Sequence, residues 1–340
     1  MIAGPIPVSS GGAMRRSVLG VGGLGLIAVA AAAVGAVLLT ARARARRIRT
    51  FPDPVALEDL LREPPGDELI VERPDGTRLR VRVAGTGPTV VLAHGIALTL
   101  GEWNLVTELL LAAGYRVVVF DARGHGQSTI GTQGISAPVM AADLTAVLVA
   151  TSTSDAILVG HSMGGFLALE AVMEVPGARE RLGGLVLVAS FAGDILDGAP
   201  QNRAEAPILR SHLLPRLTAN PTIGTLFAAS FFGPRPSPAL LTAFLHLIQS
   251  RDNAALLPLL DAFTTDDLLA RLPAIDLPTV IVCGLADRTT PPRNSRRLAT
   301  AIPGARTVWV PGAGHMLPWE APASIRDAVA SVAIAVESGR

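Results

Sequence analysis

The chain has 340 residues and nearly balanced charge, with 29 basic and 28 acidic side chains. All of the basic side chains are arginines, which excludes any mechanism that needs a catalytic lysine. The single cysteine, Cys283, excludes an intramolecular disulfide. Residues 1–50 hold seven arginines and no acid, whereas residues 51–340 hold 22 arginines and 28 acids. This mildly acidic body argues against a nucleic-acid-binding protein.

The first 50 residues form a basic leader with a long apolar stretch. The 25 residues between Arg16 and Arg42 carry no charge. As a helix they would span roughly 38 Å, enough for a hydrocarbon core of about 30 Å. The sequence therefore predicts a membrane anchor, a single transmembrane helix at about residues 17–41. More arginines follow this stretch than precede it, so the positive-inside rule predicts a cytoplasmic body. The alternative is export through a twin-arginine-like signal at Arg15-Arg16.

The body begins with a proline-rich segment, residues 51–67, which predicts a linker. The runs 68–72 and 77–83 predict an antiparallel hairpin at a sheet edge, because Pro74-Asp75-Gly76 joins them. From residue 89 onward buried strands alternate with helical patterns. Runs such as Val117-Val118-Val119-Phe120 are apolar on both faces, which predicts an α/β fold with a mostly parallel, eight-stranded sheet and helices on both faces. The six further strands are predicted at 90–93, 116–121, 156–160, 185–189, 279–283 and 306–310.

Residues 191–277 interrupt this alternation. No convincing strand occurs in them, and prolines break the sequence into short helical pieces. An insertion of this size between two sheet strands predicts a helical cap over the carboxyl edge of the sheet. The core would then consist of residues 68–190 and 278–336.

Residues 160–165 read Gly-His-Ser-Met-Gly-Gly and lie where a strand-like run meets a helical one. A serine between glycines at a strand-to-helix turn is held on a tight bend that exposes its hydroxyl at the sheet edge. The same bend directs the backbone N–H of Met163 toward negative charge that forms near Ser162. The sequence therefore predicts a nucleophilic enzyme that needs a base and an acid from elsewhere in the chain.

Five short motifs follow one another along the chain, at 92–96, 121–128, 160–164, 283–291 and 310–315. In this order they resemble the oxyanion-loop strand end, a turn, the nucleophile elbow, the acid-bearing loop and the histidine loop of the α/β-hydrolase superfamily. The resemblance covers roughly residues 68–336. One Gly-x-Ser-x-Gly sequence alone would be weak, but Ser, Asp and His follow one another in the family's chain order.

The resemblance implies a catalytic triad of Ser162, Asp287 and His315. A serine hydroxyl is nearly inert at neutral pH, so His315 would act as its base and Asp287 would orient the imidazole. Asp194 is a rival for the acid, because some relatives place it at that position. The oxyanion hole would be the backbone N–H groups of Ile96 and Met163.

The leading hypothesis is a serine hydrolase that cleaves a carboxylic ester, similar to esterases and monoacylglycerol lipases, with a lipid-like or apolar acyl substrate. An acyltransferase, a carbon–carbon bond hydrolase or a perhydrolase could use the same triad. A ligand sensor on a hydrolase scaffold is a further alternative. The expected partners are a small-molecule ester and, through the leader, the membrane; no nucleic acid or protein partner is indicated. No cofactor and no metal site are expected, since no pair of ligands has the short spacing of a zinc site.

Overall fold

A computed structural model of the chain describes residues 4, 35–195, 199–200, 202–203, 214–249 and 253–338. Contacts divide the chain after Arg44, and Ala45–Arg340 forms one compact unit. In this unit eight strands form one sheet in the order β1-β2-β4-β3-β5-β6-β7-β8. The strands are β1 Asp67–Glu72, β2 Arg78–Ala84, β3 Thr89–Ala93, β4 Arg116–Phe120, β5 Ala156–His161, β6 Leu182–Val188, β7 Thr279–Gly284 and β8 Arg306–Val310.

The predicted α/β fold and eight-stranded sheet are confirmed. The hairpin of β1 and β2 lies at one edge and joins β4 in antiparallel fashion, whereas the strands from β4 to β8 in this order pair in parallel. Successive side chains of a strand point to opposite faces. Val90 therefore belongs to the core on one face, and Val91 to the core on the other. This explains why the parallel strands are continuous apolar runs.

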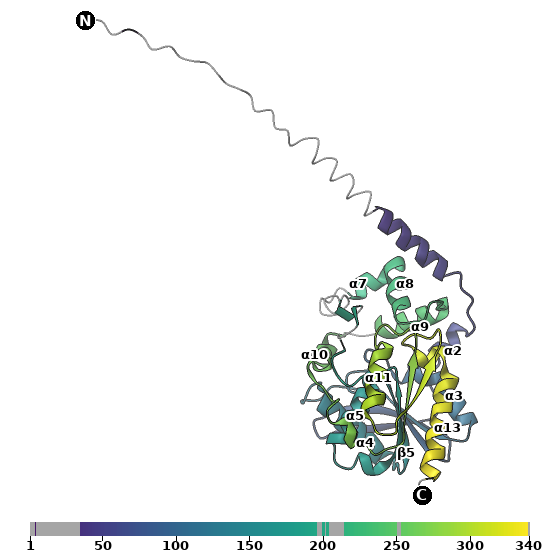
Figure 1. The fold of residues 1–340 in the computed structure, drawn as a ribbon, viewed down its shortest axis with the longest axis vertical. Helices are drawn as coiled ribbons and strands as arrows, with labels where there is room; N and C mark the ends of the chain where they lie inside the picture. Colours follow the sequence, from purple (N-terminus) through teal and green to yellow (C-terminus); the bar gives the residue numbers. More distant parts are fainter. Residues whose placement is uncertain are drawn as a thin grey trace. The chain divides into compact units, whose positions relative to one another are not determined.

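Helices cover both faces of the sheet (Figure 1). One core packs α4, α5, α10 and α11 against the strands, and the other packs α3 and α13 against the opposite face. The helices of the second unit are α2 Leu57–Leu61, α3 Asn104–Ala112, α4 Ala137–Ala150, α5 Met163–Glu174, α7 Leu214–Ala219, α8 Pro221–Ser230, α9 Pro238–Gln249, α10 Leu257–Thr265, α11 Pro292–Ala301, α12 Leu317–Glu320 and α13 Pro322–Ser338. Short 3₁₀ turns occur at Leu100–Trp103, Arg179–Arg181, Asn253–Leu256 and Leu272–Ala274.

Between β6 and β7 the described residues form helices α7 to α10 and no strand of the sheet. Asn220 begins α8 as its N-cap, where its side chain accepts hydrogen bonds from the N–H groups of Thr222 and Ile223. Residues of α8 and α9, including Phe244, form a third apolar cluster with Phe232, which follows α8, and with Trp319 of α12. In Figure 1, α7, α8 and α9 gather at one end of the sheet.

The prediction of a membrane-anchored protein is wrong on the residues that the structure describes. No helix among them is long and apolar enough to cross a membrane. The described leader helix covers residues 35–48 and so includes Arg42, Arg44, Arg46 and Arg47, whose charges are costly in hydrocarbon. From Ala45 its last turn instead packs on protein, because Ile48 is buried among apolar residues that include Leu60 and Phe232.

The rest of the leader prediction concerns residues that the structure does not describe. Residues 17–34 of the expected span and the Arg15-Arg16 pair lie outside the described residues. Just beyond the leader helix, the Arg49 guanidinium donates to Pro221 O and, at 3.0 and 3.2 Å, to Thr225 Oγ1. The chain at this point is thus bound to α8.

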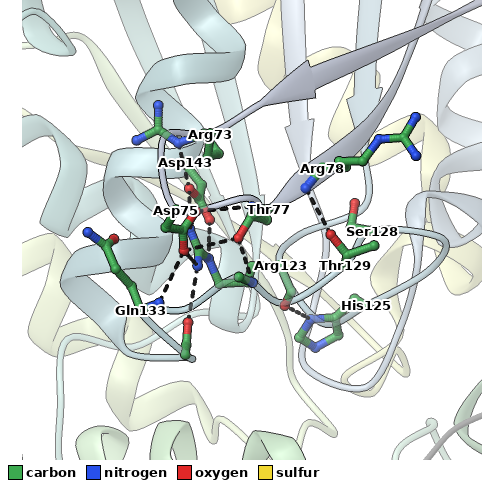
Figure 2. A network of polar contacts seen from close by, with 12 residues as sticks. Arg73, Asp75, Thr77, Arg78, Arg123, His125, Ser128, Thr129, Gln133 and Asp143 are labelled. Atoms are coloured by element: carbon green, nitrogen blue, oxygen red, sulfur yellow. Dashed lines mark hydrogen bonds and ion pairs between the residues drawn. The ribbon is translucent and has the colours of Figure 1, made fainter.

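A buried ion network fixes the turn that follows β4 (Figure 2). The Arg123 side chain is only 1% exposed and donates to Asp143 of α4 at 2.7 and 3.0 Å. It also binds Asp75, in the turn between β1 and β2, and Arg73 donates to Asp143 at 2.9 Å. Burial lowers the pKa of Arg123, but the two carboxylates outweigh burial and raise that pKa overall. One guanidinium thus joins the edge hairpin, the turn after β4 and α4.

We expect Arg123→Met to lower the free energy of unfolding by about 3–5 kcal/mol, because it leaves the buried Asp143 carboxylate with one cation fewer. Urea denaturation at pH 7 measures this loss. Arg326→Met is the control, since Arg326 pairs with Asp327 on the surface and its loss should cost within about 0.5 kcal/mol. Similar losses in both variants would contradict the role assigned to the network.

Candidate active site

Ser162 is the single residue that connects the end of β5 at His161 to the start of α5 at Met163. Its backbone has φ 51° and ψ −115°, a strained conformation for a residue with a side chain. Hydrogen bonds hold this conformation: Ser162 N–H donates to Val188 O at 2.9 Å, and Ser162 O accepts from Ser190 Oγ at 3.0 Å and Phe166 N at 3.2 Å. The predicted elbow is therefore present as a strained, well-supported turn.

Two glycines allow the chain to pass closely at this turn. A Cβ on Gly160 would lie 2.5 Å from Gly165 Cα, and a Cβ on Gly164 would lie 2.1 Å from Ala93 O. Both distances are far below van der Waals contact, and both involve backbone that cannot move aside cheaply. The start of α5 is consequently pressed against the end of β3, where the predicted oxyanion loop begins.

The structure joins Asp287 to His315. Asp287 follows β7 and His315 follows β8, and their Oδ2 and Nδ1 atoms lie 2.9 Å apart. Asp287 Oδ1 accepts the N–H groups of Thr289 at 2.8 Å and Thr290 at 2.9 Å, which fixes the carboxylate. Both side chains are almost fully buried. A buried carboxylate on Nδ1 holds the imidazole with Nε2 free to act on another group.

Thr290 is a part of this arrangement that the sequence analysis missed. Its hydroxyl lies 2.7 Å from Asp287 Oδ2, 2.8 Å from Ala189 O and 3.2 Å from His315 Nδ1. The side chain therefore ties the acid loop to the end of β6. The feature of the sequence that could have indicated this role is the position of Thr290, three residues after Asp287 within the acid-bearing loop 283–291.

The rival acid, Asp194, lies in the loop after β6 with φ 44°. Within the described part of the chain no hydrogen bond joins it to His315, whereas Asp287 contacts the imidazole directly. Nor does a hydrogen bond join the Ser162 hydroxyl to His315 among the described residues. Catalytic hydrogen bonds are often long without substrate and tighten when it binds.

The two predicted oxyanion donors lie on neighbouring loops. Met163 is the first residue of α5, so its N–H has no acceptor within the helix. Ile96 lies in the loop after β3, next to Ala97 with its positive φ of 60°. Among the backbone hydrogen bonds in the turns, loops and helix ends of the described chain, none is donated by either of these two N–H groups.

His94 braces the base of that loop. One ring nitrogen, Nδ1, lies 2.8 Å from Gly95 O, and the other, Nε2, accepts the Ala122 N–H at 2.9 Å. Because a carbonyl oxygen only accepts, these contacts assign the proton to Nδ1 and the neutral tautomer to the ring. His94 is thereby engaged on both nitrogens as a supporting residue.

Glu320 connects the histidine loop to the segment 191–277. Its Oε1 accepts the Gly233 N–H at 2.7 Å, and its Oε2 accepts the Gly314 N–H at 2.9 Å, directly before His315. His315 N–H itself donates to Phe231 O at 2.7 Å. Burial raises the pKa of Glu320 to about 7, although the two backbone donors act to lower it.

Aromatic side chains from the segment 191–277 lie beside the imidazole. The Phe231 and His315 ring centroids are 6.4 Å apart. Phe231 also contacts Phe227 and Phe244, with centroid distances of 5.3 and 4.8 Å. The surroundings of the histidine on this side are therefore apolar.

The geometry agrees with comparisons to known proteins. A family model described as alpha/beta hydrolase fold matches residues 88–322. The chain belongs to this family. A non-heme chloroperoxidase from Kitasatospora aureofaciens is 29% identical over 250 residues, covering 71% of this chain and 90% of its own. An AB hydrolase superfamily protein from Bacillus subtilis is 29% identical over 237 residues, covering 70% and 88%.

Solved structures of α/β hydrolases are similar as well. A hydrolase from Pseudomonas aeruginosa PA01 has a TM-score of 0.66 and 27% identity, with 78% of this chain and 98% of that one covered. A thermophilic esterase from Thermogutta terrifontis has a TM-score of 0.66 and 26% identity, with 80% and 99% covered. The chain is thus an enzyme of the α/β-hydrolase family, with relatives named hydrolases, esterases and haloperoxidases.

The raised pKa of Glu320 predicts a pH-dependent contribution to stability. Its folded pKa of about 7 exceeds its ordinary 4.5, so the folded state retains a proton that the unfolded state has lost between these values. Stability from this group is therefore full below about pH 4.5 and is lost as pH rises toward 7, by about 1.4 kcal/mol per pH unit at most. We expect the stability loss caused by Glu320→Gln to be largest at or below about pH 4.5 and smaller at pH 8.

Urea denaturation of both proteins across this range checks the effect. Glu72→Gln is the control, because the Glu72 side chain is 79% exposed and its replacement should change stability by no more than about 0.5 kcal/mol. A loss for Glu320→Gln that grows with pH would contradict the assignment.

Proposed function

We propose that the protein is a serine hydrolase that cleaves a carboxylic ester through an acyl-enzyme on Ser162. The observation that carries this proposal is the pairing of a strained, glycine-flanked serine turn with a buried Asp287–His315 hydrogen bond. These groups follow β5, β7 and β8, which are parallel strands. Their carboxyl ends meet at one edge of the sheet, which supports our assignment of the three side chains to one site.

In this mechanism Ser162 attacks the ester carbonyl as His315 Nε2 accepts the hydroxyl proton. Asp287 keeps the proton on Nδ1 and stabilises the imidazolium that forms. The imidazolium then gives its proton to the leaving alcohol, and the acyl-enzyme remains. A water molecule deprotonated by His315 hydrolyses this intermediate and regenerates the serine. The first step requires that the Ser162 hydroxyl come within hydrogen-bond reach of His315 Nε2.

Negative charge on the carbonyl oxygen would be stabilised by the N–H groups of Ile96 and Met163. Support comes from their position on the two loops that Gly164 brings into contact, and from the lack of a carbonyl acceptor for either within the described residues. Loss of one such donor typically costs about 3–4 kcal/mol of transition-state stabilisation. Side-chain substitution at Ile96 leaves its N–H in place.

Replacement of Ser162 by Ala tests the nucleophile. We expect hydrolysis of 4-nitrophenyl butyrate to fall at least about 1,000-fold, because no other group can form the acyl-enzyme. Labelling by a fluorophosphonate probe should disappear as well. Ser338→Ala, on the exposed end of α13, is the matched control and should behave as wild type. Undiminished hydrolysis by the Ser162 variant would disprove the proposed function.

The acyl group is proposed to be apolar, because Phe231, Phe227 and Phe244 form an aromatic group beside His315. We expect Phe231→Ala to reduce kcat/KM about tenfold for 4-nitrophenyl octanoate and much less for the acetate, since only the longer chain reaches these rings. Steady-state kinetics across acyl lengths measure the difference. The substitution leaves the Phe231 carbonyl, which holds His315, in place. An equal loss for both esters would contradict the assignment of these rings to the acyl group.

A perhydrolase is the second candidate, and similarity to a non-heme chloroperoxidase favours it. Hydrogen peroxide would then replace water as the acceptor of the acyl group, and a peracid would be the product. An alcohol acceptor would make the protein an acyltransferase in the same way. Product analysis with peroxide or alcohol present distinguishes these acceptors, because the first half of the reaction is common to all of them.

A further inference from the structure

A buried pair of titratable side chains, Glu102 and His161, lies beside the candidate site and has no part in the proton transfers described above. Glu102 belongs to the 3₁₀ turn Leu100–Trp103, and His161 is the last residue of β5. Both side chains are 0% exposed, and His161 Nδ1 lies 3.2 Å from Glu102 Oε2. An ionic pair without any solvent access is expensive to maintain, and apolar residues of similar size usually fill such space at lower cost.

The pair makes contacts with two loops of the site. Glu102 Oε1 accepts the N–H of Gly95, which directly precedes the proposed oxyanion donor Ile96. His161 Nε2 lies 3.0 Å from the carbonyl oxygen of His315. His161 itself is joined by a peptide bond to Ser162. One hydrogen-bonded chain thus runs from the oxyanion loop through the nucleophile turn to the histidine loop.

The direction of these hydrogen bonds defines the proton on the ring. The His315 carbonyl can only accept, so His161 Nε2 carries a proton. The other nitrogen faces a carboxylate, with which it shares a second proton. Burial lowers the pKa of His161, but the charge of Glu102 and the hydrogen bonds outweigh burial and raise that pKa overall. The titratable groups that face His161 are Glu102, His315 and, at longer range, Asp287.

Packing allows the ring little freedom. A Cβ on Gly95 would lie 3.0 Å from His161 Nδ1, so the imidazole lies directly against the backbone of the oxyanion loop. Trp103 contacts its edge, with a centroid distance of 6.3 Å and an interplanar angle of 86°. The His315 ring is 4.9 Å away on another side. The His161 imidazole therefore lies between the oxyanion loop and the His315 loop, and the spacing of these loops matters for the proposed reaction.

We propose that Glu102 and His161 are positioning residues for acyl transfer, which hold the oxyanion loop and the His315 loop at a fixed spacing around Ser162. This inference rests on the proposed function of Ser162. A shift of about 1 Å in catalytic groups can cost 100-fold in rate, so the brace should act on turnover more than on substrate binding.

The test compares His161→Leu, His161→Gln and Glu102→Gln in the full chain with 4-nitrophenyl butyrate. His161→Leu removes both hydrogen bonds and should lower kcat at least tenfold, with KM changed less than threefold. His161→Gln offers an amide donor to the His315 carbonyl and should recover part of that kcat. Glu102→Gln should lower kcat, and its combination with His161→Leu should be no slower than His161→Leu alone, because both remove the same brace.

Arg80→Met is the matched control for lost stability. Arg80 is a buried ion-pair residue of β2, three strands from β5 in the sheet, and its loss should lower the melting temperature without lowering kcat. Equal kcat in wild type, Glu102→Gln and His161→Gln would overturn the brace. A fall in kcat for Arg80→Met as large as that for the pair, at equal loss of stability, would also overturn it.

The same experiment distinguishes the two proposals. If Ser162→Ala is inactive while the Glu102 and His161 variants retain wild-type kcat, only the brace fails. If Ser162→Ala retains full activity, the proposed function fails and the brace fails with it. Should His161→Leu not fold, the nearly isosteric Glu102→Gln still decides the outcome.

Discussion

The structure depends on one close contact, the approach of the start of α5 to the end of β3. Gly164 allows it, because any side chain there would collide with the Ala93 carbonyl. The approach brings the N–H of Met163 next to the loop that carries Ile96, and the strained backbone of Ser162 lies directly before it. Hydrogen bonds with Val188 at the end of β6, with Ser190 just after it and with Phe166 of α5 hold this strain. Rigid surroundings thus stabilise a conformation that the isolated turn would not adopt.

Around this contact, buried polar side chains fix loops to one another. Arg123 joins the turn after β4 to the edge hairpin, Glu320 joins the histidine loop to the segment 191–277, and Glu102 with His161 joins the loops nearest the serine. Loops have few apolar side chains to bury, so charge-assisted hydrogen bonds do for them what apolar packing does for the sheet. Burying such groups costs free energy, and the groups that are buried at this cost lie in or beside the loops at the sheet edge that carries Ser162.

Much of the fold was accessible from local pattern. Strands such as Val90–Ala93 and Thr279–Cys283 were predicted within a residue or two, because apolar runs bounded by glycine and proline have few other solutions. The leader was misjudged on the described residues, because the described helix 35–48 runs past residue 41 through Arg42, Arg44, Arg46 and Arg47, and no described helix is long and apolar enough to cross a membrane. Glu102 and Glu320 were missed, since no short-range pattern marks a side chain whose partner is distant in sequence. Thr290 was missed although it lies only three residues after Asp287.

Local pattern alone was enough for the class of fold, the glycine-flanked serine and the order Ser162, Asp287, His315, because each of these depends on neighbours within a few residues or on a recognisable motif. That Asp287 rather than Asp194 contacts the imidazole, and that His161 is bound to Glu102, followed only from the folded chain. The physical reason is that these hydrogen bonds act over about 3 Å in space, and the folded backbone alone sets which distant residues come that close.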